Sequence, residues 1–133
     1  MSAGVDVTGW SAADYLAALD RGTSGMWSVE AALWLLERHG VWLDDPRFRA
    51  YVDVTLNDRA EPWAGIDVPG VGAAVEAGKF GEWNEDIAVL CFVLSLYGTY
   101  PIPLRYTCEN LSEENLALIG KALSLACGYG EPG

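Results

Sequence analysis

The chain of 133 residues has a formal charge of −11 at pH 7, because 19 Asp and Glu residues outnumber 8 Lys and Arg residues. A surface of that sign repels nucleic-acid phosphates and anionic lipid headgroups, so we expect no direct binding to nucleic acid or to a membrane. Hydrophobic residues make up 51% of the chain, and this length is enough for one domain with its own core. We predict a flexible tail over residues 1–9, where no periodic pattern occurs, and a single helical domain over residues 10–130.

The cysteines and the N-terminus indicate a cytoplasmic protein. Cys91, Cys108 and Cys127 are odd in number and widely spaced, and they form no CxxC pair. Reduced thiols are the simplest interpretation. The first residues contain no basic segment followed by an apolar one, as a secretory signal would. Arg outnumbers Lys by six to two, a bias that resembles proteins of high-GC bacteria or their phages.

The first predicted helix begins at a capping box, in which Ser11 is the N-cap and Asp14 takes the place of the usual Glu. Trp10 and Tyr15 are spaced for a hydrophobic staple across this helix start. Gly22 ends the helix.

The second predicted helix covers residues 28–39, with Ser28 as N-cap and Gly40 after its end. Trp34 falls on its polar side, between Glu30 and Arg38. Either a second layer of packing covers Trp34, or the ring is exposed as an anchor for a partner, a role in which tryptophan is enriched.

Asp45 and Pro46 begin a third predicted helix over residues 45–56, with a cap and an N1 proline in their preferred places. Residues 52–57 also alternate between apolar and polar, as a strand would. The cap favours the helix. Residues 57–70 are predicted to be irregular, and a short helix follows over residues 71–77.

Residues 84–97 are predicted to form the central helix. Asn84 caps its start, Gly98 follows its end, and Ser95 is the single plainly polar residue from position 87 onward. Such a segment has no side for water, so the rest of the chain must surround it. It is too short to span a membrane, which needs about 20 apolar residues. A buried strand is the alternative, because several of these residues are β-branched.

Two prolines keep residues 99–103 extended, and residues 102–108 alternate in polarity like an edge strand. Ser112 then caps a last helix over residues 112–127. The fold class is therefore mainly α: a single compact domain of five or six helices packed round 84–97 and 112–127. Residues 51–57 and 102–108 could pair as a minor two-stranded element.

Catalytic motifs are missing from the sequence. His39 is the one histidine, and it occupies a helix C-terminus, where a cation is favoured by the helix dipole. No nucleophile elbow, phosphate loop or dinucleotide fingerprint occurs. We predict no cofactor, no metal and no catalytic residue.

The leading functional hypothesis is a non-enzymatic acidic protein of the immunity, antitoxin or inhibitor type, which binds a basic protein partner. The simpler interpretation is that the charge serves solubility alone. One alternative is a small enzyme or ligand-binding domain that uses carboxylates and aromatics in a pocket between helices. A further alternative is a homo-oligomeric structural protein.

The predicted partner surface combines aromatic area with carboxylates that would steer a cationic partner. An alternative is that Trp63 packs over Trp34 and shields it from water. The predicted binding residues are Trp34, Asp58, Glu61, Trp63 and Asp67.

Overall fold

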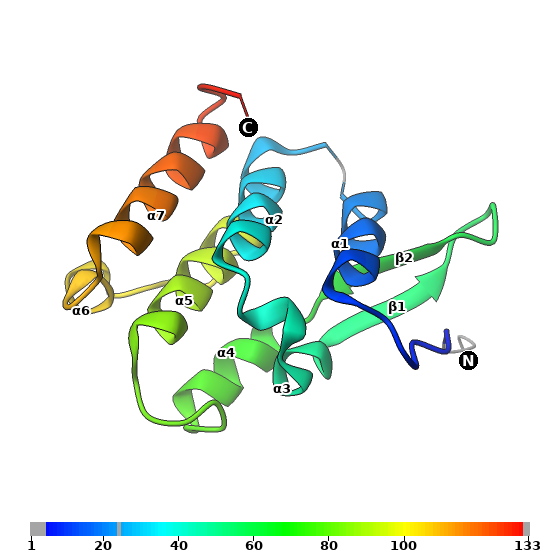
Figure 1. Cartoon of the computed structure of the whole chain (residues 1–133), viewed down its shortest axis with the longest axis horizontal. Helices are drawn as coiled ribbons and strands as arrows, with labels where there is room; N and C mark the ends of the chain where they lie inside the picture. The colour runs from blue at the N-terminus through cyan, green and yellow to red at the C-terminus, as the bar shows by residue number, and fades with distance from the viewer. Residues whose placement is uncertain (1–4, 24, 132–133) are drawn as a thin grey trace.

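Helix α5 (Glu85–Tyr97) lies at the centre of the fold (Figure 1). Its eight consecutive residues from Ile87 to Leu94 are all buried. The Asn84 side chain accepts a hydrogen bond from the Ile87 backbone N–H at 3.1 Å, and the helix ends before Gly98. Helices α2, α4, α6 and α7 contact α5. The predicted central helix is therefore confirmed.

The computed structural model describes residues 5–23 and 25–131, and this part of the chain forms seven α-helices, one short 3₁₀ helix and one two-stranded sheet. The predicted mainly helical domain with a minor two-stranded element is confirmed. No helix in the described ranges combines the length and the apolar character needed to cross a bilayer. Besides α5, the elements are α1 (Ala12–Arg21), α2 (Trp27–His39), η1 (Trp42–Asp44), α3 (Pro46–Arg49), β1 (Val52–Leu56), β2 (Pro62–Ile66), α4 (Val68–Glu76), α6 (Leu104–Cys108) and α7 (Glu113–Ala126).

Helix α2 lies between α7 and α1 (Figure 1). The tail predicted over residues 1–9 lies partly outside the described residues, which begin at residue 5. Within the described part of this tail, Val7 packs against the core, and its carbonyl accepts a hydrogen bond from the Trp10 N–H at 3.0 Å.

Helix α1 begins as predicted. The Ser11 side chain accepts a hydrogen bond from the Asp14 N–H at 3.2 Å, and the Asp14 carboxylate accepts one from the Ser11 N–H at 2.8 Å. The Trp10 and Tyr15 rings meet edge to face, with centroids 5.2 Å apart. The predicted start of α2 was wrong: Met26 is the N-cap, without a side-chain hydrogen bond.

The predicted helix over 45–56 was wrong after its first turn. Helix α3 ends at Arg49, and β1 pairs antiparallel with β2, with Val52 opposite Ile66 and Val54 opposite Ala64. These four apolar residues lie on one face of the hairpin and pack against or within the core. The alternation of apolar and polar residues therefore predicts the strand correctly, and the Asp45 cap accounts only for the single helical turn before it.

The predicted pairing of 51–57 with 102–108 was also wrong. Residues 104–108 form α6, and the strand that pairs with β1 lies within the segment predicted to be irregular. Asn57 closes the turn between the strands: its side-chain oxygen accepts hydrogen bonds from the N–H groups of Arg59 and Glu61, both at 2.9 Å. Because the Asn57 side chain stabilises this turn, β1 pairs with the strand that follows it directly in the sequence.

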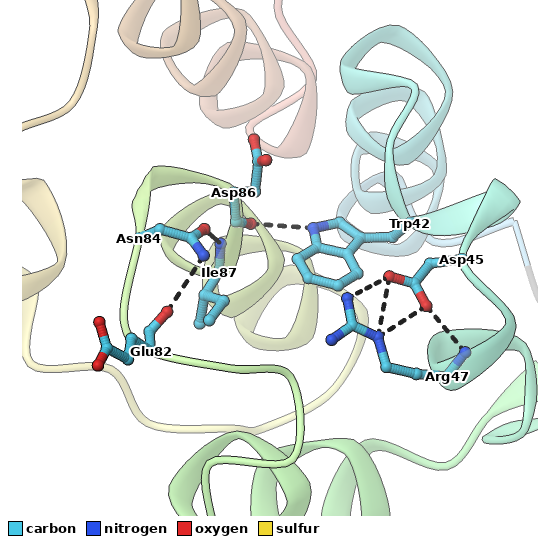
Figure 2. A network of polar contacts seen from close by, with 7 residues as sticks. All are labelled: Trp42, Asp45, Arg47, Glu82, Asn84, Asp86 and Ile87. Atoms are coloured by element: carbon cyan, nitrogen blue, oxygen red, sulfur yellow. Dashed lines mark hydrogen bonds and ion pairs between the residues drawn. The ribbon is translucent and has the colours of Figure 1, made fainter.

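Polar contacts fix the start of α5 against the end of α2 and against η1, and Figure 2 shows those that involve Trp42 and its neighbours. The Trp42 indole N–H donates to the Asp86 carbonyl at 2.9 Å, and His39 Nε2 lies 2.9 Å from Asp86 Oδ1. Beside Trp42, Asp45 and Arg47 form an ion pair with a closest distance of 2.7 Å. Hydrogen bonds from the Arg47 side chain lower the pKa of Asp45. The one histidine therefore contacts a carboxylate in the first turn of α5.

Gly22 brings the end of α1 into close contact with β2, and we expect its replacement to be destabilising. A Cβ at Gly22 would lie 2.1 Å from the Ala64 carbonyl oxygen. Gly22→Ala should therefore lower the free energy of unfolding in urea by about 1–3 kcal/mol, the usual cost of overpacking.

Gly120→Ala in α7 is the matched control, because a Cβ there would meet nothing within 4 Å. This change should raise the free energy of unfolding by up to about 1 kcal/mol through helix propensity. Equal effects of the two substitutions would contradict the close contact between α1 and β2.

Candidate functional site

The structure divides the five predicted binding residues between two surfaces. Trp34 lies on α2, whereas Asp58, Glu61, Trp63 and Asp67 belong to the β hairpin and the residue after it. Trp63 is 42% exposed and lines a depression on the outer face of the hairpin. Trp34 lines a different depression, so the two tryptophans do not form one continuous site.

The hairpin acids differ in what they contact. Asp58 is exposed in the turn. A Glu61 carboxylate oxygen lies 4.0 Å from Arg21 Nε. The Asp67 side chain caps α4 by accepting a hydrogen bond from the Gly70 N–H at 3.1 Å. Asp67 thus stabilises a helix start, which leaves Asp58 and Trp63 as the freer parts of this surface.

The depression beside Trp34 is a groove between α1 and α2, with a volume of about 390 Å³. We call it the Trp34 groove. Helix α1 contributes two residues and α2 the other five: Leu16, Asp20, Glu30, Leu33, Trp34, Glu37 and Arg38.

Three acidic residues line this groove together with Trp34. Glu30 and Glu37 are seven residues apart and so share one face of α2, with Trp34 between them. Asp20 faces them from α1. The Arg38 guanidinium carbon lies 5.4 Å from the centroid of the Trp34 ring, which is the geometry of a cation–π contact. The groove therefore combines negative charge with an aromatic surface that already holds a cation.

Trp34 is half-buried. Part of the ring packs against the core, and its indole N–H is buried without a hydrogen-bond partner among the described residues. An unpaired buried N–H lowers stability by about 1–3 kcal/mol. The apolar packing of the ring against the core must offset this loss. What Trp34 offers to the groove is the carbon surface of the ring and not its N–H.

Trp34 was predicted as a binding residue from the sequence, but the three acidic residues of the groove were not. The positions of Glu30 and Glu37 relative to Trp34 were a usable signal, because residues four and three apart are neighbours on a helix. The place of Asp20 depends on the packing of α1 against α2, for which the sequence carries no local signal.

A second depression lies between α4, α5 and the segment that leads into α6, and its volume is about 260 Å³. We call it the aromatic cleft. None of its residues was predicted from the sequence to belong to a site. Its chemically distinctive residues are Glu76, Trp83, Cys91, Tyr100 and Tyr106, and two prolines and a valine complete it.

Comparisons of the chain with protein-family models, with curated proteins and with solved structures found no match. Within residues 5–23 and 25–131, no three His, Cys, Asp or Glu side chains are grouped so that they could hold a metal ion. Function is therefore inferred from the chemistry of the Trp34 groove and the aromatic cleft.

Mutation can test whether Trp63 is part of the hydrophobic core. Trp63→Ala should lower the free energy of unfolding by less than about 1 kcal/mol, since surface substitutions are mild. Trp42→Ala is the contrasting variant, because Trp42 is 2% exposed and donates a hydrogen bond to Asp86. It should cost about 3–5 kcal/mol. Equal losses in urea unfolding would show that Trp63 belongs to the core and is not available to a partner.

Cys91 should make stability depend on pH in the alkaline range. Burial, and secondarily the charge of Glu76, raises its pKa from 9.0 to about 11. The native state therefore favours the neutral thiol, and this stabilisation is complete below pH 9 and lost as the pH rises towards 11. Its size is on the order of 2 kcal/mol.

Urea unfolding at a series of pH values checks this expectation. Cys91→Ala should reduce the loss of stability between pH 9 and pH 11, whereas Cys127→Ala, at an exposed position, should leave it unchanged. The same alkaline slope in wild type and Cys91→Ala would exclude the thiol as its source.

Proposed function

We propose that this protein is a non-enzymatic interaction protein that binds a basic segment of a partner protein in the Trp34 groove. The observation that carries the proposal is that Asp20, Glu30 and Glu37 line the same groove as the half-buried Trp34. This is the chemistry of an immunity, antitoxin or inhibitor protein that covers a cationic surface.

Negative charge favours a basic partner both at long range and at contact. The net charge of −11 attracts a cationic protein from afar and raises its rate of association. At contact, the three carboxylates of the groove outnumber its one guanidinium. Both effects weaken as salt is added, because exposed charges are screened.

The aromatic ring supports a Lys or Arg side chain as the group that is bound. The Trp34 ring already holds the Arg38 guanidinium at 5.4 Å, so a partner's cation could take the same kind of position. Tryptophan also contributes large binding energies when it is enclosed by polar neighbours. The groove thus offers a basic side chain both an ion pair and an apolar contact.

The hairpin surface extends this proposal to a larger partner. Helix α1 lies between α2 and the hairpin (Figure 1), so the groove and the surface bearing Asp58, Glu61, Trp63 and Asp67 flank the same helix. A partner that reaches across α1 would contact both areas, and Trp63 would be the second aromatic anchor.

A pull-down from the native host tests the proposal. The bait is the wild type or a groove variant carrying Asp20→Asn, Glu30→Gln and Glu37→Gln. We expect a basic protein to be retained by the wild type at low salt, and to be released at high salt or by the groove variant, because both remove local charge attraction.

A matched control separates the groove from net charge. Glu82→Gln, Glu109→Gln and Glu114→Gln remove the same number of charges at exposed positions outside both the groove and the Trp63 depression. This control should still retain the partner. Equal loss with the groove variant and the control, or retention by both, would contradict binding in the Trp34 groove.

A further inference from the structure

We propose that the aromatic cleft is a binding site for an alkylated ammonium group. It lies between α4, α5 and α6, away from the groove between α1 and α2. The inference therefore does not depend on the proposed function. It rests on the cleft's aromatic walls, its single carboxylate and its size.

Three aromatic side chains form the walls of the cleft. The Trp83 and Tyr106 rings pack together with centroids 5.0 Å apart and an interplanar angle of 41°. The Tyr100 ring lies directly on α4, where a Cβ at Gly72 would be 2.5 Å from its Cε1 atom. Tyr100 is therefore held in place before any ligand arrives, which lowers the cost of binding.

Glu76 gives the cleft a negative charge. It is the one charged residue among the described residues that line the cleft, and its carboxylate accepts a hydrogen bond from the Tyr100 hydroxyl at 3.3 Å. Burial, followed by the charge of Glu76, raises the pKa of both Tyr100 and Cys91. Both groups stay protonated at neutral pH, so the lining keeps the single negative charge of Glu76.

The walls distinguish an alkylated ammonium from a metal ion or a bare ammonium. A metal ion needs several oxygen, nitrogen or sulfur ligands, whereas this lining is mainly aromatic and aliphatic. Aromatic rings attract a quaternary ammonium through the cation–π interaction, and apolar walls suit its methyl groups. One carboxylate then balances the charge.

The volume limits the size of the ligand. At about 260 Å³, the cleft is smaller than the pockets of about 300–1,000 Å³ that hold drug-sized molecules. It suits a small free ammonium compound, or the end of one modified side chain carried by a protein. Both sources present the same chemical group.

Calorimetric titration with choline tests the proposal, with 3,3-dimethylbutan-1-ol as the matched ligand. This alcohol has the shape of choline but a carbon atom in place of the charged nitrogen. We expect saturable binding of choline at millimolar concentrations or below, and much weaker binding of the alcohol. Equal binding of the two ligands, or no saturable heat with choline, would overturn the proposal.

Variants then locate the binding. We expect two substitutions, Glu76→Gln and Trp83→Ala, each to weaken choline binding by about three- to thirtyfold. Glu76→Gln keeps the shape of the side chain, and Trp83 is already 37% exposed. The controls are Glu114→Gln on α7 and Trp27→Ala, at a side chain that is 62% exposed and outside the cleft. Circular dichroism confirms that each variant is folded. Unchanged affinity in both cleft variants, or equal weakening in the controls, would place any binding elsewhere.

A peptide carrying trimethyllysine distinguishes the two sources of the ammonium group. Affinity no higher than that of choline would assign the cleft to a free compound. Affinity more than tenfold higher, lost when the lysine is unmodified, would assign it to a modified protein.

Discussion

The burial of α5 is the constraint on which the rest of the structure depends. Eight consecutive residues of this helix are excluded from water, so every side of it must be covered by another part of the chain. Helices α2 and α7 cover part of it, and α4 and α6 cover other parts. Both candidate sites follow from this arrangement. The aromatic cleft forms where the cover of α5 is the one-turn helix α6 and its lead-in segment, and the Trp34 groove forms where α2 turns its charged side towards α1.

Most helices could be predicted because their ends carry local signals. Ser11, Asn84 and Ser112 are side-chain caps in the structure, as predicted. The hairpin could not be predicted in the same way, since β2 contains a proline, an alanine and a glycine, which are poor strand formers. Its pairing with β1 is determined by the apolar face that both strands turn towards the core. Asp45 caps a helix as expected, but a cap fixes where a helix begins and not how far it continues.

The sites were less accessible to sequence analysis than the fold, and the reason is geometric. Trp34 could be selected because it was out of place on a polar helix face, whereas Asp20 joins it only when α1 packs on α2. The aromatic cleft takes Glu76 from the end of α4, Trp83 from the segment between α4 and α5, and Tyr100 from the segment after α5. Residues brought together from separate segments share no spacing rule, so neither helical nor strand periodicity could group them.

Helix α7 packs along α2, although the two lie near opposite ends of the chain (Figure 1). A polypeptide is synthesised from its N-terminus, so α2 leaves the ribosome before α7, and one side of α2 remains uncovered until residues 113–126 have followed. During this interval the chain exposes apolar surface that chaperones bind and that promotes aggregation. Any delay in translation between α2 and α7 lengthens the exposure, whereas a delay before α2 does not. We therefore expect the yield of folded protein in the cell to depend on the speed of synthesis between α2 and α7.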